Sequence, residues 1–200
     1  MSGKKPYHKE DLRGDLLKAG RAYVEANGHL GLSMRTLAQQ VGVSPGAPYH
    51  HFPDRRAFLL ALAGEGFREM LALSQAVADT EADPAAKLRA LGTVFIRFAE
   101  ENPHLVDLMY ESELTSPALD TELLAFQQIG HEALRAEIVR AMPGLVEEAA
   151  DVRTLTFWSA IYGFASMRRK GVIRSGPSTP ATVDLAEAIV ERVIVAVLAP

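Results

Sequence analysis

The twenty residues 33–52 (SMRTLAQQVGVSPGAPYHHF) constrain the fold of this chain more than any other stretch. Leu37 and Val41 lie on one face of a short predicted helix, and Ser33 stands before it, where a hydroxyl can accept a first-turn amide. Gly42 follows where the chain must turn, and glycine tolerates a positive φ at little cost. Two helices joined by such a turn predict a helix-turn-helix, whose second helix lies in the DNA major groove.

The second helix of this motif is predicted over residues 44–51. Ser44 and Pro45 are typical of a helix start, because serine caps free amides and proline at the first helical position loses nothing by lacking an N–H. With Ser44 as the cap, Pro48 is the fourth helical residue and removes about the first regular hydrogen bond. This helix is therefore predicted to be short and 3₁₀-like.

Small residues also limit what this second helix can present to a groove. Gly46 and Ala47 leave little side chain there, which favours close backbone approach and contact with a thymine methyl. Tyr49 and His50 are the best candidates for phosphate or base contact. His51 has no partners at metal-ligand spacing, so packing or capping is favoured over a metal role.

The segment after the turn extends the motif. Residues 49–58 (YHHFPDRRAF) resemble the TetR/AcrR family of transcriptional regulators, whose pattern is roughly small-x-Tyr-x-x-Phe-x-(Ser/Asp/Asn)-(Lys/Arg)-x-x-(Leu/Phe). The resemblance is specific over residues 9–62 and looser beyond, and Pro48 departs from the aliphatic residue that most members carry. It implies that Arg55 clamps a DNA phosphate near the start of the next helix, which Asp54 is predicted to cap.

Charge supports a DNA-binding head. Residues 1–60 carry nine Lys and Arg against five Asp and Glu, whereas the remaining 140 carry twelve against twenty. A basic first third on an acidic body is typical of a DNA-reading head on a regulatory domain. The residues predicted to contact DNA are Lys9, Ser33, Arg35, Thr36, Ser44, Pro45, Gly46, Ala47, Tyr49, His50 and Arg55.

The whole chain is predicted to be all-α, with about nine helices in two domains. Residues 1–53 form an N-terminal three-helix helix-turn-helix domain, and residues 54–200 form a C-terminal helical domain for ligand binding and dimerisation. Apolar periodicity and breaker residues predict the helices at 9–27, 33–41, 44–51, 54–79, 84–101, 103–112, 118–141, 151–170 and 181–198.

A second resemblance lies in the C-terminal domain. Residues 158–165 (WSAIYGFA) resemble a Trp-x-x-x-His-Gly segment of one branch of TetR-like C-terminal domains, with Tyr162 in the place of the histidine. Family members commonly bind a small molecule in this domain, which implies an effector, and the apolar majority of the candidate residues indicates a hydrophobic or aromatic one. The candidates, each of which is alternatively plain core, are Phe95, Phe98, Met109, Tyr110, Phe126, Ile129, Trp158 and Tyr162.

The last helix is too apolar to face water. Together with residues 151–170 it is expected to pair with its copies in a second chain as a four-helix bundle, which gives a homodimer. Burial inside one chain is the alternative. The predicted interface residues are Leu155, Val183, Ile189, Val190, Val193, Ile194 and Val197.

The sequence lacks the motifs that are typical of enzymes and metal-binding proteins. It has no cysteine, Gly-rich phosphate loop, zinc spacing or serine nucleophile elbow, and Glu111 and Glu113 near His104 and Asp107 are interpreted as a solvated cluster. We therefore expect no catalysis, cofactor or metal. With no run of 18 apolar residues and no secretory signal, a cytoplasmic protein without membrane contact is expected.

These features predict a homodimeric, TetR-like repressor. It is expected to bind a near-palindromic double-stranded operator and to leave it when a small effector binds. One alternative keeps this fold and DNA binding without a small-molecule effector. The other is a helical enzyme or interaction scaffold with a degenerate helix-turn-helix.

Overall fold

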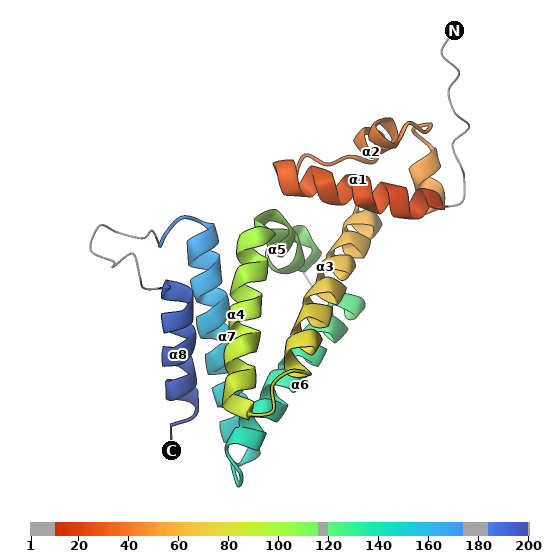
Figure 1. The fold of residues 1–200 in the computed structure, drawn as a ribbon. Helices are drawn as coiled ribbons and strands as arrows, with labels where there is room; N and C mark the ends of the chain where they lie inside the picture. Colours follow the sequence, from red (N-terminus) through yellow and green to blue (C-terminus); the bar gives the residue numbers. More distant parts are fainter. Residues whose placement is uncertain (1–10, 116–119, 174–183, 200) are drawn as a thin grey trace. The chain divides into compact units, whose positions relative to one another are not determined.

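The computed structural model describes residues 11–115, 120–173 and 184–199, and the chain in these ranges is all-α (Figure 1). The described part holds eight α-helices and two 3₁₀ helices, η2 and η3. The prediction of about nine helices counted residues 44–51 as one, whereas these residues contain only the 3₁₀ helix η2. The elements are α1 (Leu12–Asn27), α2 (Met34–Val41), η2 (Ala47–His50), α3 (Arg55–Ala78), α4 (Pro84–Glu101), α5 (Pro103–Tyr110), η3 (Glu113–Thr115), α6 (Thr121–Ala141), α7 (Glu147–Arg169) and α8 (Leu185–Val197).

The chain divides into two compact units. The N-terminal unit comprises Met1–Gly66 and His104–Asp120, and the C-terminal unit comprises Phe67–Pro103 and Thr121–Pro200. This division differs from the predicted boundary between residues 53 and 54, because the first part of α3 and most of α5 belong with the helix-turn-helix. The chain therefore passes between the units three times.

The core of the N-terminal unit joins residues that lie far apart in the sequence. Leu16 of α1, Leu37 of α2, Phe58 of α3 and Leu105 of α5 are all fully buried. Each such side chain contributes about 1.5–3 kcal/mol relative to an exposed position. Gly20 permits the close approach of α1 to α3, because a Cβ there would lie 2.3 Å from Cζ of Phe58.

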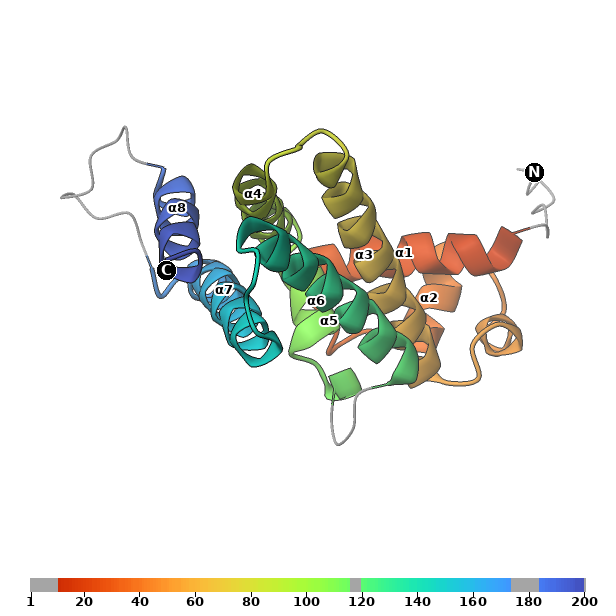
Figure 2. The ribbon, with the colours of Figure 1, turned by 90° about the horizontal axis from the view of Figure 1, so that it is seen from below.

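In the C-terminal unit, α4 packs against α6, α7 and α8, and Figures 1 and 2 show α8 lying beside α7. A Cβ at Gly92 of α4 would lie 3.3 Å from Phe157 and 3.4 Å from both Ile161 and Val190. A small residue on α4 thus lets three helices meet closely.

Side-chain caps set the starts of α3 and α4. The amide of Ala57 donates to the carboxylate of Asp54 over 2.7 Å at the start of α3. Asp83 accepts from the amide of Ala86 over 2.7 Å, and Pro84 opens α4. The predicted cap at Asp54 is therefore confirmed.

Candidate nucleic-acid interface

Helix α2 begins and ends as the sequence predicts. The hydroxyl of Ser33 accepts from the amide of Thr36 over 3.1 Å, which caps the first turn. Gly42 ends the helix in the left-handed conformation at φ 80°. The amide of Gly42 donates to the Gln39 carbonyl, and the amide of Val43 donates to the Ala38 carbonyl over 2.9 Å. This pair of bonds is a Schellman motif, which ends a helix at a fixed turn.

The second part of the motif is a single 3₁₀ turn. The residue at its cap position is Gly46, whereas the sequence predicted Ser44 as the cap. Pro48 is the second residue of η2. The amide of Tyr49 donates to the Gly46 carbonyl over 3.2 Å, a three-residue bond in place of the four-residue α-helical one. The predicted short, 3₁₀-like form is confirmed, and the cap prediction was wrong because Pro48 cannot donate to Ser44.

Burial alternates sharply along this turn. Pro48 and Phe52 are buried, and the ring of Phe52 meets that of Phe58 edge to face with centroids 5.0 Å apart. Tyr49 and His50 between them are exposed, with Tyr49 at 53%. Two buried anchors therefore hold two exposed side chains that are able to donate and accept hydrogen bonds.

Most of the other predicted DNA contacts also lie at the surface of this unit. Arg35, Ser44, Pro45 and Gly46 are exposed, while Ser33, Thr36 and Ala47 are partly buried. Lys9 lies outside the described residues.

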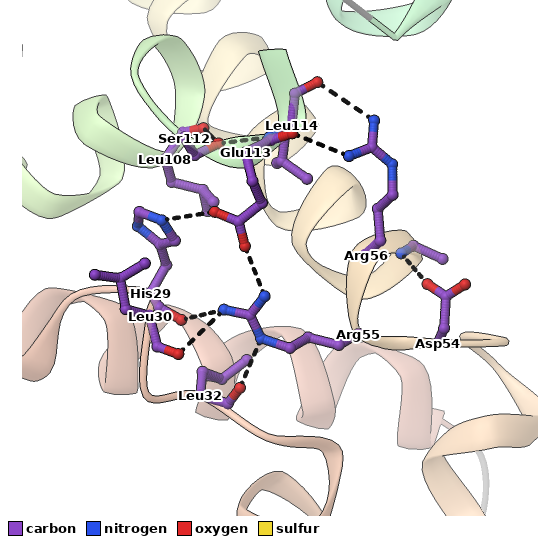
Figure 3. A network of polar contacts seen from close by, with 11 residues as sticks. His29, Leu30, Leu32, Asp54, Arg55, Arg56, Leu108, Ser112, Glu113 and Leu114 are labelled. Atoms are coloured by element: carbon purple, nitrogen blue, oxygen red, sulfur yellow. Dashed lines mark hydrogen bonds and ion pairs between the residues drawn. The ribbon is translucent and has the colours of Figure 1, made fainter. Parts of the chain in front are cut away.

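Arg55, the predicted phosphate clamp, forms several hydrogen bonds within the N-terminal unit (Figure 3). Its Nε donates to the Leu32 carbonyl over 2.8 Å, and its Nη2 donates to the carbonyls of His29 and Leu30 over 2.7 and 3.3 Å. Its Nη1 donates to Oε1 of Glu113 over 2.6 Å. The guanidinium therefore binds the loop that precedes α2, and the predicted phosphate contact of Arg55 stays a prediction.

Glu113, interpreted as part of a solvated cluster, is indeed 42% exposed, but it also forms specific contacts that the sequence did not predict. Its Oε2 lies 3.0 Å from Nε2 of His29, while its Oε1 accepts from Arg55. Partial burial raises the pKa of the Glu113 carboxyl. The hydrogen bonds from Arg55 and from its own backbone amide, with the charges of His29 and Arg55, outweigh this effect and hold the pKa below its ordinary value.

Sequence reasoning missed His29, Arg56 and Glu113 as parts of this network. Arg56 donates from Nη1 to the Glu113 carbonyl over 3.1 Å and from Nη2 to the Leu114 carbonyl over 3.4 Å. The partners are separated by 57 to 84 residues in sequence, so no local spacing points to them.

The predicted effector-binding residues are distributed over both units. Phe95, Trp158 and Tyr162 of the C-terminal unit form an aromatic cluster, with ring centroids 4.7 Å apart between Phe95 and Trp158 and 5.8 Å between Trp158 and Tyr162. Met109 and Tyr110 belong to the N-terminal unit.

The other three candidates have separate surroundings. Phe98 is buried, and Phe126 stacks on Phe67 with centroids 5.7 Å apart. Ile129 is 51% exposed. A ligand-binding role for these residues therefore stays a prediction.

The predicted dimer residues need correction. Val190, Ile194 and Val197 are only 0, 5 and 1% exposed within one chain, so burial inside the chain is the correct interpretation for these three. Ile189 and Val193 are partly buried, and Val183 lies outside the described residues.

Other apolar side chains of the same two helices are exposed. Leu155, one of the predicted interface residues, is 53% exposed, and Val152 and Val195, which were not predicted, are 59 and 61% exposed. Open hollows lie along this face, and one of them is lined by Val152, Leu155, Thr156, Ser159 and Ala160. None of the eight predicted effector-binding residues lines it or the neighbouring hollow between α7 and α8.

The described residues contain neither a membrane-spanning helix nor a metal-binding cluster. None of the helices there has the length and apolar character needed to cross a membrane. No group of three or more His, Asp or Glu side chains in the same ranges is arranged to hold a metal ion.

Similar structures have been solved. A protein of unknown function from Rhodococcus sp. RHA1 is 26% identical and has a TM-score of 0.81, with 98% of this chain and 97% of that one covered. PfmR, a TetR-family regulator from Thermus thermophilus, is 21% identical and has a TM-score of 0.65, with 92 and 96% covered. The second likeness shows a shared fold.

Curated relatives match over a shorter range. The nucleoid occlusion factor SlmA of Vibrio vulnificus is 32% identical over 110 residues, which are 54% of this chain and 55% of the relative. The factor of the same name from Vibrio cholerae is 31% identical over 120 residues, 56% of this chain and 60% of the relative. The chain thus spans little more than half the length of these relatives.

Two family models match the chain. The model for bacterial regulatory proteins of the tetR family matches residues 16–62, and the model for the tetracyclin repressor-like C-terminal domain matches residues 88–194. The second range alone exceeds half of the chain, and the first contains the helix-turn-helix described above. The chain therefore belongs to the TetR family of DNA-binding transcriptional regulators, which are not enzymes.

Proposed function

We propose that this chain is a homodimeric repressor whose two helix-turn-helix motifs bind the half-sites of a near-palindromic operator. The observation that carries this proposal is the capped α2 helix followed by a 3₁₀ turn whose buried Pro48 and Phe52 hold Tyr49 and His50 outward. Two-fold symmetry of the protein would match two-fold symmetry of the DNA, with one motif in each of two successive major grooves.

The DNA contacts that we propose are those that the sequence predicts. Gly46 is exposed and a Cβ there would meet no atom within 4 Å, so the backbone can approach a groove closely. Tyr49 and His50 supply the large side chains of the turn. The proposed contact set is Lys9, Ser33, Arg35, Thr36, Ser44, Pro45, Gly46, Ala47, Tyr49, His50 and Arg55.

For the dimer, we propose the exposed face of α7 and α8. Val152 and Leu155 of α7 and Val195 of α8 are each more than half exposed. Covering such a face with the same face of a second copy would bury apolar area on both chains, as in an isologous four-helix bundle. This proposal keeps the predicted helices and Leu155 and replaces the residues that one chain already buries.

For the effector, we propose a small hydrophobic or aromatic molecule at the cluster of Phe95, Trp158 and Tyr162. Phe95 is buried, whereas Trp158 and Tyr162 are partly accessible, so the cluster offers aromatic faces to a ligand. Release from DNA requires that the ligand bind the released conformation more tightly than the DNA-bound one. A thermal-shift screen of aromatic compounds tests for such a ligand, because binding to the native state raises the melting temperature.

The curated relatives support a second candidate, DNA binding without a small-molecule effector. They are named nucleoid occlusion factors, a name that mentions no small-molecule ligand. Absence of any stabilising compound in the thermal-shift screen, together with intact DNA binding, would favour this candidate.

The test of DNA recognition is selection from a randomised duplex pool at physiological salt, followed by sequencing of the retained duplexes. We expect an inverted repeat, an affinity that falls steeply with salt because counterions are released, and weaker binding after Tyr49→Ala. Retention of all duplexes alike, or of none, would reject sequence-specific repression while leaving the fold unchanged.

A further inference from the structure

We propose that Glu113 is a positioning residue for DNA binding, which acts through Arg55 on the loop that leads into α2. Glu113 lies in η3, 58 residues beyond Arg55 and outside the helix-turn-helix. The proposal extends the DNA-binding function of the family to a residue outside the predicted contact set.

The first step is the loop at residues 29–32. It ends one residue before Ser33, the cap of α2, so its path sets where α2 begins. Arg55 donates hydrogen bonds to three of its carbonyls, those of His29, Leu30 and Leu32. A planar guanidinium donates in several fixed directions at once, which the compact ammonium of a lysine does not reproduce.

The second step is the carboxylate that holds the guanidinium. One oxygen of Glu113 accepts from Nη1 of Arg55 over 2.6 Å, and the other lies 3.0 Å from Nε2 of His29 in the loop itself. Glu113 therefore contacts both the loop and the side chain that binds the loop (Figure 3). Charge-assisted bonds of this kind are short and directional.

The third step is the anchoring of Glu113. The hydroxyl of Ser112 donates to the Leu108 carbonyl over 2.7 Å and accepts from the Leu114 amide over 3.2 Å, which fixes the turn between α5 and η3. Arg56 donates to the Glu113 carbonyl over 3.1 Å. Glu113 is thus presented by a segment whose own backbone is held in place.

Electrostatics alone gives the opposite expectation, which makes the proposal testable. Removing a negative charge from a DNA-binding unit should strengthen attachment to a polyanion. Loss of positioning should weaken it, because α2 and the following turn no longer reach the duplex in a fixed geometry. The sign of the change in affinity therefore separates the two effects.

The experiment compares Glu113→Gln with Glu25→Gln on the duplex that the wild-type protein enriches most. Glu25 is a matched control, since it also pairs with an arginine of the N-terminal unit, and the side chains of Glu25 and Glu113 are 47 and 42% exposed. We expect Glu113→Gln to weaken binding at least fivefold, and Glu25→Gln to leave it unchanged or stronger. In an Arg55→Ala background, Glu113→Gln should change the affinity by less than twofold, since coupled residues are not additive.

Equal or tighter binding by Glu113→Gln, or the same loss with and without Arg55, would overturn the proposal. Amide hydrogen exchange supplies a readout that needs no DNA and so separates this proposal from the operator proposal. Exchange over residues 29–36 should become faster in Glu113→Gln and stay unchanged in α4 and α7; equal rates over 29–36 would also overturn it. If Glu113→Gln does not fold, Glu113→Asp is measured in the same way, with a smaller change in the same direction expected.

Discussion

The two ends of helix α2 are fixed by contacts of different range. At its C-terminal end, Gly42 and Val43 bond to carbonyls three to five residues back. At its N-terminal end, the loop that precedes Ser33 is held by Arg55 and Glu113, which are 23 to 84 residues away. The first end is determined by neighbouring residues, whereas the second forms only when the N-terminal unit has assembled.

The largest expected effect tests the long-range contacts that assemble the N-terminal unit. Gly20→Ala places a Cβ 2.3 Å from the ring of Phe58, which is fully buried. Helix propensity by itself favours alanine by about 1 kcal/mol. Overpacking costs about 1–3 kcal/mol, and an approach of 2.3 Å places this site at the upper end of that range. After subtraction of the propensity gain, we expect a net loss of about 2 kcal/mol in the free energy of unfolding, measured by urea denaturation.

The control for this substitution is Gly130→Ala in α6, where a Cβ would meet nothing within 4 Å. It should raise the free energy of unfolding by about 0.5–1 kcal/mol through propensity alone. A gain at Gly20 as well would show that α1 does not need its close approach to α3.

The second-largest expected effect tests the local contacts at the C-terminal end of α2. Gly42 has φ 80° and open space around its Cβ position, so Gly42→Ala adds backbone strain without a clash. We expect a loss of about 1 kcal/mol in the free energy of unfolding, because side chains disfavour this region. Gly46, at φ −84° and equally open, should tolerate alanine without loss. Equal effects at the two glycines would argue against the left-handed turn.

The same contrast explains what the sequence could predict. The cap at Ser33, the glycine turn and the 3₁₀ form around Pro48 follow from residues within a few positions of one another, and the structure confirms them. Arg55 occupies the basic position of the family pattern, which implied a phosphate contact. Its partners in the chain, Glu113 and the His29 carbonyl, are distant in sequence and were identified only from the structure.

A similar limit applies to the C-terminal unit. Periodicity identified α8 as an apolar helix but did not show which of its faces α4 and α7 cover. Val190 and Ile194 were therefore expected at a dimer interface, although the chain itself buries them. A helix with apolar residues on most of its faces can be buried by helices of its own chain and by a second chain. Its sequence does not show which face each of them covers.

The smallest expected effect is the pH dependence of the Glu113 network. The pKa of Glu113 is lowered in the folded chain from its ordinary value of 4.5, so folding favours the charged carboxylate. Its contribution to stability is present above about pH 4.5 and is lost as the pH falls through the lower folded-state pKa. The difference in unfolding free energy between the wild type and Glu113→Gln should therefore shrink between pH 6 and pH 3, by less than about 1 kcal/mol because the pair is partly exposed. Urea midpoints at several pH values measure this difference. A gap that stays constant down to pH 3 would mean that Glu113 stabilises the loop by packing, and that its charge contributes little to holding the start of α2.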